Sequence, residues 1–125
     1  MLMGEFKQEL LKIHNTVNME IFYQGLVNQR VEIHRDKAII IARNHRVKVL
    51  SIVDQHDKTT SRMVDLALLA AFKERFRELA NAHFGVPILS LIKDYDPTLE
   101  MSVSVVFYHQ PIEELLHVMR TKDIT

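Results

Sequence analysis

The sequence predicts an α+β fold, a two-layer sandwich in which a four-stranded, mainly antiparallel sheet packs on two long helices. Two long segments carry apolar residues at helical spacing, and four short segments carry the alternating or β-branched pattern of strands. Their order along the chain is αββαββ, followed by a C-terminal helix. A chain of 125 residues lies near the commonest domain size, so we predict one domain over residues 1–125.

The first half of the chain is expected to form a helix and two strands. Apolar residues at three- or four-residue steps predict a helix over about 5–23, which Gly25 can end: they are Phe6, Leu10, Ile13, Val17 and Ile21. Residues 30–34 alternate polar and apolar side chains, as a half-buried strand does. Residues 38–42 are apolar throughout, which is typical of a central strand covered on both faces. A second subunit or the closing helix is expected to supply the outer cover.

The second half begins with an ambiguous segment. Residues 44–55 fit a strand or a short helix capped by Asn44, and we favour the helix. A wide apolar stripe then predicts a long helix over about 59–84, which the hydroxyl residues at 59–61 can cap and Gly85 can stop.

Two more strands and a short helix complete the predicted fold. The strands are expected over 88–93 and 101–107, joined by a loop over 93–97. Pro111 suits the first turn of the final helix. The residues expected to be mostly buried are Val31, Ile33, Ile40, Leu66, Phe76, Ile92, Val103 and Val105.

Composition excludes several classes of function. Sixteen Lys and Arg balance sixteen Asp and Glu, so the chain lacks the positive field of a typical nucleic-acid binder. It has no cysteine for disulfides or thiolate chemistry. The N-terminus does not resemble a secretory signal, and no apolar run is long enough to cross a bilayer. We therefore expect a cytoplasmic protein that does not insert into the membrane directly.

Motifs that would identify a reaction are missing. The sequence has no phosphate-binding glycine loop, no nucleophile elbow and no His-Glu-x-x-His, and the three glycines are too few for most phosphate loops. The seven histidines form no helical i,i+4 pair. Acidic clusters at 54–57 and 94–96 fit turn chemistry better than metal binding. We predict no catalytic residue, no metal and no cofactor, and favour a protein that is not an enzyme.

One polar segment is a candidate ligand site. It follows the apolar strand and contains Arg43, Asn44, His45, Arg46 and Lys48. Cationic groups beside a helix N-terminus can hold an anion. The alternative, which we favour, is that these side chains solvate a loop and pair with nearby carboxylates.

The chain resembles the MpsC-like family. The resemblance rests on 31–41 (VEIHRDKAIII), on 44–47 (NHRV) with Leu50, on the helix through Phe76, and on 92–97 (IKDYDP) followed by 103–107. By name the family is a component of a sodium-translocating, membrane-potential-generating system. The resemblance implies a non-enzymatic accessory or regulatory protein of a cation- or bicarbonate-linked membrane transport system, peripheral to the membrane through a transport-protein partner.

Two other function classes remain open. The 43–48 segment could make the protein a small-molecule or anion-binding module, and histidines and aspartates from separate segments could form an enzyme of unfamiliar type. We also expect a homo-oligomer, most simply a dimer, because the doubly apolar strand 38–42 needs more cover than a small domain offers.

Overall fold

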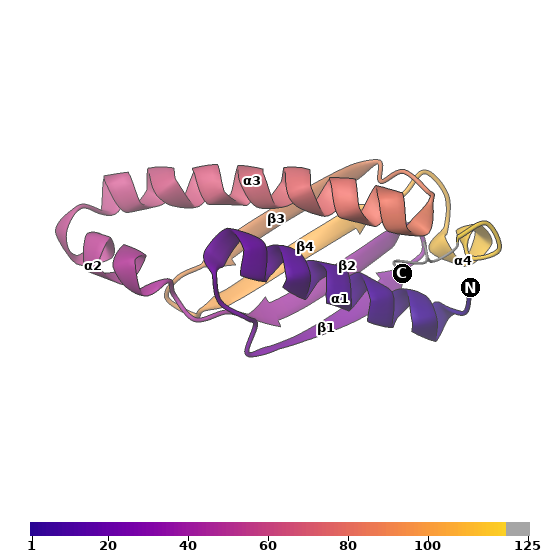
Figure 1. The fold of residues 1–125 in the computed structure, drawn as a ribbon, viewed down its shortest axis with the longest axis horizontal. Coiled ribbons are helices and arrows are strands. Elements are labelled where there is room, and N and C mark those ends of the chain that lie inside the picture. Colours follow the sequence, from indigo (N-terminus) through magenta and orange to yellow (C-terminus); the bar gives the residue numbers. More distant parts are fainter. Residues whose placement is uncertain (120–125) are drawn as a thin grey trace.

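The computed structural model describes residues 1–119 and has the predicted α+β architecture (Figure 1). The elements are α1 (Met3–Phe22), β1 (Asn28–His34), β2 (Lys37–Arg43), α2 (Lys48–His56), α3 (Lys58–Phe84), β3 (Ser90–Asp96), β4 (Met101–Phe107) and α4 (Ile112–Leu115). The ambiguous segment is therefore a short helix, as we favoured.

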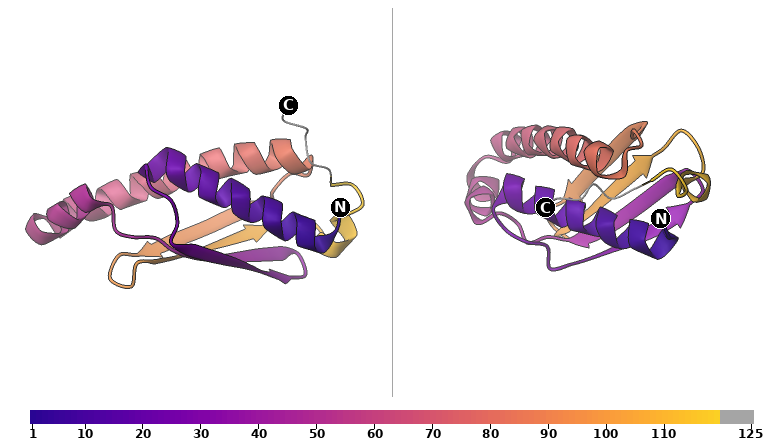
Figure 2. Two further views of the ribbon diagram at one scale, coloured as in Figure 1. Left: turned by 60° about the horizontal axis from the view of Figure 1, so that its bottom comes forward. Right: turned by 45° about the vertical axis from the view of Figure 1, so that its right-hand side comes forward.

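The four strands form one antiparallel sheet in the order β1-β2-β4-β3. β1 pairs with β2 and β3 pairs with β4, as two hairpins. The long connection through α3 carries the chain from β2 to the far edge of the sheet, so that β3 forms the edge and β4 lies beside β2. The apolar strand β2 is therefore central, as predicted. Figure 2 shows that α1 and α3 both lie on the same face of the sheet, so β2 is covered by helices on one face only.

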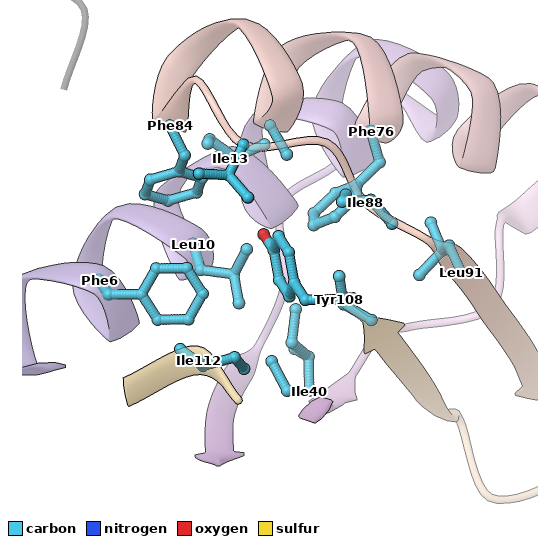
Figure 3. Packing of buried hydrophobic residues seen from close by; sticks show 14 of the residues in the cluster. Phe6, Leu10, Ile13, Ile40, Phe76, Phe84, Ile88, Leu91, Tyr108 and Ile112 are labelled. Atoms are coloured by element: carbon cyan, nitrogen blue, oxygen red, sulfur yellow. The ribbon is translucent and has the colours of Figure 1, made fainter. Parts of the chain in front are cut away.

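The core fills the space between the helices and this inner face (Figure 3). Phe6 and Leu10 of α1 meet Phe76 and Phe84 of α3 above Ile40 of β2, and all five are fully buried. Aromatic rings contact one another across the layer, with the Phe6 and Phe84 centroids 5.0 Å apart. The closing helix α4 also packs on this cluster. Within residues 1–119, no element therefore covers the second face of the sheet.

The outer face of the sheet is the side on which no helix of the described residues 1–119 lies. Its apolar residues are Ile39, Ile41, Ile92, Met101, Val103, Val105 and Phe107, which alternate with the helix-facing residues along each strand. Ile92 is 58% exposed and Val103 is 42% exposed. The prediction that these two residues are mostly buried is wrong for this chain, because it assumed a cover on both faces.

The other positions predicted to be buried are buried to different extents. Phe76 and Ile40 are fully buried, whereas Val31, Ile33 and Val105 are only partly buried. Leu66 is 64% exposed. The prediction is wrong there because the first part of α3 extends past the end of the sheet, where only the short helix α2 packs beside it (Figure 1).

Several predicted element ends also need correction. Helix α1 stops at Tyr23, which takes the left-handed conformation (φ 57°), before Gly25 is reached. Helix α3 is capped by the side chain of Asp57, which accepts from the Thr60 N–H, and not by the hydroxyls at 59–61. Gly85 ends α3 as predicted, with φ 72°.

The remaining two corrections concern Asn44 and the loop after β3. Helix α2 begins at Lys48 with Val47 as its N-cap, so Asn44 caps nothing. Strand β3 runs to Asp96, so most of the predicted 93–97 loop is strand. Strand alternation therefore fixes the side chains of residues 93 and 95 on the same face of the sheet, the one that faces the helices.

Candidate functional site

A small cavity lies where the end of α1, the β2–α2 connection, α3 and the inner face of β3 and β4 meet. Its volume is about 20 Å³, which is room for about one water molecule. The lining residues are Phe22, Gln24, Asn44, His45, Arg46, Val47, Leu50, Asp65, Leu69, Lys93, Tyr95 and Ser102. Three of the five predicted site residues are among them.

Lys93 is the most unusual group at this cavity. Strand alternation points it inward between Leu91 and Tyr95, and it is only 5% exposed. Its Nζ lies 3.0 Å from Ser104 Oγ and 3.2 Å from His14 Nε2. It also lies 4.1 Å from the centroid of the Phe72 ring. Within residues 1–119 no carboxylate forms an ion pair with Lys93, so all its contacts are neutral.

His14 is held so that it can accept a hydrogen bond from Lys93. Its Nδ1 lies 3.0 Å from Gln29 Oε1, which can only accept, and Gln29 Nε2 donates to the Leu11 carbonyl at 2.9 Å. This chain of bonds places the imidazole proton on Nδ1 and leaves the lone pair of Nε2 for Lys93. Burial, with a contribution from the Lys93 charge, lowers the pKa of His14 to about 3. His14 therefore stays neutral.

Burial also lowers the pKa of Lys93, from 10.5 to about 7. Desolvation disfavours the ammonium, and no carboxylate within residues 1–119 compensates for it. Lys93 therefore loses its proton far more readily near neutral pH than an exposed lysine does. A group that changes charge so readily at neutral pH, beside a cavity, is a typical feature of functional sites.

Asn44 sits at the centre of a second buried network. Its Nδ2 donates to Asn18 Oδ1 at 3.1 Å, and its Oδ1 accepts from Ser102 Oγ at 3.1 Å. Its backbone carbonyl accepts from the Tyr95 hydroxyl at 2.9 Å. The second N–H of the Asn44 amide has no protein partner among residues 1–119. This donor and the Lys93 ammonium are buried donors at the cavity that have remaining capacity to bind an acceptor.

Arg46 has its charge matched by two carboxylates. It binds Asp54 through Nε and NH2, both at 2.9 Å, and Asp65 through NH1 at 2.6 Å. Ser61 joins Arg46 to Asp54 as well. Bonds from Arg46 and Ser61 lower the pKa of Asp54 to about 2. Arg46 therefore joins α2 to α3, and it has no spare charge for a ligand.

The other predicted site residues lie apart. Arg43 ends β2 on the outer face of the sheet, and Lys48 is exposed at the start of α2; neither lines the cavity. His45 lines it but is largely exposed, with Nδ1 3.3 Å from Glu100 Oε2. The structure therefore brings together Asn44, His45 and Arg46, and separates Arg43 and Lys48 from them.

Two important side chains were missed in the sequence. The prediction places Lys93 where the strand over 88–93 meets the loop over 93–97, although the alternation of Leu91, Lys93 and Tyr95 would put all three on one strand face. His14 falls on the apolar stripe of the first helix, beside Ile13 and Val17. A polar residue at a core position is the signal that could have found both.

Comparison with known proteins adds no assignment: no family model, curated protein or solved structure matches this chain. Within residues 1–119, no group of three His, Asp or Glu side chains is arranged to hold a metal ion. None of the helices in this part of the chain is both long and apolar enough to cross a bilayer.

Proposed function

We propose that this protein is a non-enzymatic regulatory protein that binds a small anion at Lys93. The observation that carries the proposal is a buried amine that lines a cavity and has only neutral partners. An ammonium in such a place is costly unless a charge of opposite sign accompanies it. A bound anion would supply that charge.

The cavity limits the anion to a small one. About 20 Å³ accommodates a group the size of a water molecule, so even formate, bicarbonate or the head of a small carboxylate would have to widen the cavity to bind there. Lys93 would supply the charge, and the free N–H of Asn44 a second donor. Arg46 would position the β2–α2 connection and hold Asp65 away from the ligand through their ion pair.

Binding of an anion would be coupled to proton uptake. An opposite charge next to an ammonium raises its pKa, so Lys93 would become fully protonated when the ligand enters. The site would therefore respond to both anion concentration and pH near 7. A coupled response of this kind is a property that a regulator can use.

The resemblance to the MpsC-like family suggests what is regulated. It favours an accessory role in a cation- or bicarbonate-linked membrane transport system, with the protein reaching the membrane through a transport protein. Deleting the protein and measuring sodium-dependent growth and membrane potential tests that part. Unchanged growth and potential, with no membrane protein co-purifying, would remove the transport role and leave anion binding untouched.

The melting temperature tests anion binding directly. Sodium formate should raise it at pH 7 and act weakly at about pH 9.5, where Lys93 is neutral. Sodium gluconate, too bulky for the cavity, controls for ionic strength. Lys93→Met should abolish the response, whereas Lys48→Met removes an exposed lysine outside the cavity and should preserve it. An equal response to gluconate, or one that survives Lys93→Met, would refute the proposal.

A further inference from the structure

We infer that the outer face of the sheet is the interface of a face-to-face homodimer, with Arg30 of each copy paired to Asp94 of the other. This inference is independent of anion binding at Lys93, which lies on the inner face. It starts from the seven apolar residues of the outer face, of which Ile92 and Val103 are the most exposed. Apolar faces of this kind mark interaction surfaces in soluble domains.

The strand register arranges this face in rows that cross the sheet. One row reads Arg30, Ile41, Val103, Asp94 from β1 to β3, because Arg30 pairs with Ile41, Ile41 with Val103, and Val103 with Asp94. The row is therefore cationic at one end, apolar in the middle and anionic at the other end. It is complementary to itself when reversed.

A twofold axis parallel to the strands, between β2 and β4, produces that reversal. It places β1 of one copy over β3 of the other, and β2 over β4. Arg30 then opposes Asp94 of the second copy twice, by symmetry, and Ile41 opposes Val103. Packed sheets lie about 10 Å apart and cross at about 30°, a separation that the long Arg30 side chain can bridge.

The charges at both ends of the row are unengaged in the single chain. Within residues 1–119 neither Arg30 nor Asp94 forms an ion pair, and the carboxylate of Asp94 accepts only from the adjacent Tyr95 N–H. Both are exposed. Pairing across a dimer would satisfy them and surround the apolar rows with charge, as interfaces commonly do.

The alternative twofold axis, across the strands, fits less well. It would place Arg30 over Glu32 of the second copy, but it would also bring Arg43 against Lys37. Like charges in close contact disfavour that arrangement. The two axes predict different rescuing partners for Arg30, so they can be separated experimentally.

The size of the face indicates a weak, reversible dimer. Four strands about 4.8 Å apart and seven residues long at about 3.3 Å per residue give a face of about 19 Å by 23 Å. Two such faces amount to about 880 Å², below the roughly 1,200 Å² at which stable interfaces begin and in the range of transient ones. We therefore expect the dimer to form only at the upper end of the micromolar range.

Sedimentation equilibrium of the full chain between about 1 and 200 µM tests the inference. The chain should shift from the 14.6 kDa monomer to twice that mass. Val103→Glu should leave only monomer. Leu66→Glu is the control, because Leu66 is also apolar and is more exposed than Val103 (64% against 42%), but lies on α3, away from the sheet. Its dimer should persist. Circular dichroism confirms that each variant is folded.

Charge exchange identifies the axis. Arg30→Asp and Asp94→Arg should each weaken the homodimer about tenfold or more, and mixing the two variants should restore a heterodimer with both ion pairs re-formed. A wild-type chain that stays monomeric, a dimer that survives Val103→Glu, or one abolished by Leu66→Glu would overturn the inference. Rescue of Arg30→Asp by Glu32→Arg in place of Asp94→Arg would overturn the proposed axis.

Discussion

Replacing Lys93 with Met should remove the part of the free energy of unfolding that changes with pH above 7. The folded-state pKa of Lys93, about 7, lies below its ordinary value of 10.5. The unfolded chain therefore binds more protons between these two values, and the lysine contributes a free energy of unfolding that rises with pH across that window. Methionine has a similar length and no charge, so the variant should lose this pH dependence.

The expected size follows from the pKa values. At about 1.4 kcal/mol for each factor of ten in protonation, the Lys93 contribution should change by about 3 kcal/mol between pH 7 and about pH 9.5. Urea unfolding of wild type and Lys93→Met at both pH values measures it. Met cannot donate to His14 or Ser104, and the loss of these hydrogen bonds also changes the free energy of unfolding. This change is similar at both pH values, so it cancels when the two are compared. A difference between the two proteins that is the same at both pH values would refute the reasoning.

Two further substitutions test the packing and the polar network. Phe76→Ala should lower the free energy of unfolding by about 3–5 kcal/mol because Phe76 is fully buried, whereas Leu66→Ala should lower it by less than about 0.5 kcal/mol. Thermal unfolding of both variants measures the two costs. Equal costs would contradict the assignment of Phe76 to the buried face of α3. Asn44→Ala should cost about 2–4 kcal/mol by leaving Asn18 and Ser102 without their partner, with Arg43→Ala nearly neutral. Chemical denaturation measures both, and a neutral Asn44→Ala would show that the network adds nothing to stability.

Periodicity predicted the fold because local patterns determine most of it. The stripe from Phe6 to Val17 and the apolar run 38–42 each identify one element, and Gly85 marks the end of α3. The strand order did not follow, because β2 pairs with β4 through contacts distant in the chain. The exposure of Ile92 and Val103 was missed for a related reason. An apolar strand pattern indicates that a face favours burial, but it does not identify the element or the second molecule that would bury it.

The candidate site was predicted in part. Asn44, His45 and Arg46 do meet at one cavity, and pairing with carboxylates accounts for Arg46. The group with the most unusual chemistry, Lys93, was missed because its environment depends on His14, which lies 79 residues away in the sequence. Burial of a lysine depends on the tertiary structure, which a single strand pattern does not contain.

The measurement that tests the central claim most directly is an NMR titration of the Lys93 side chain, followed through its ε-carbon with and without formate. We predict a midpoint near pH 7 in the free protein and a midpoint raised by at least about one pH unit when formate is bound. A free-protein midpoint near the ordinary lysine value of 10.5, or one that formate leaves unchanged, would contradict the account.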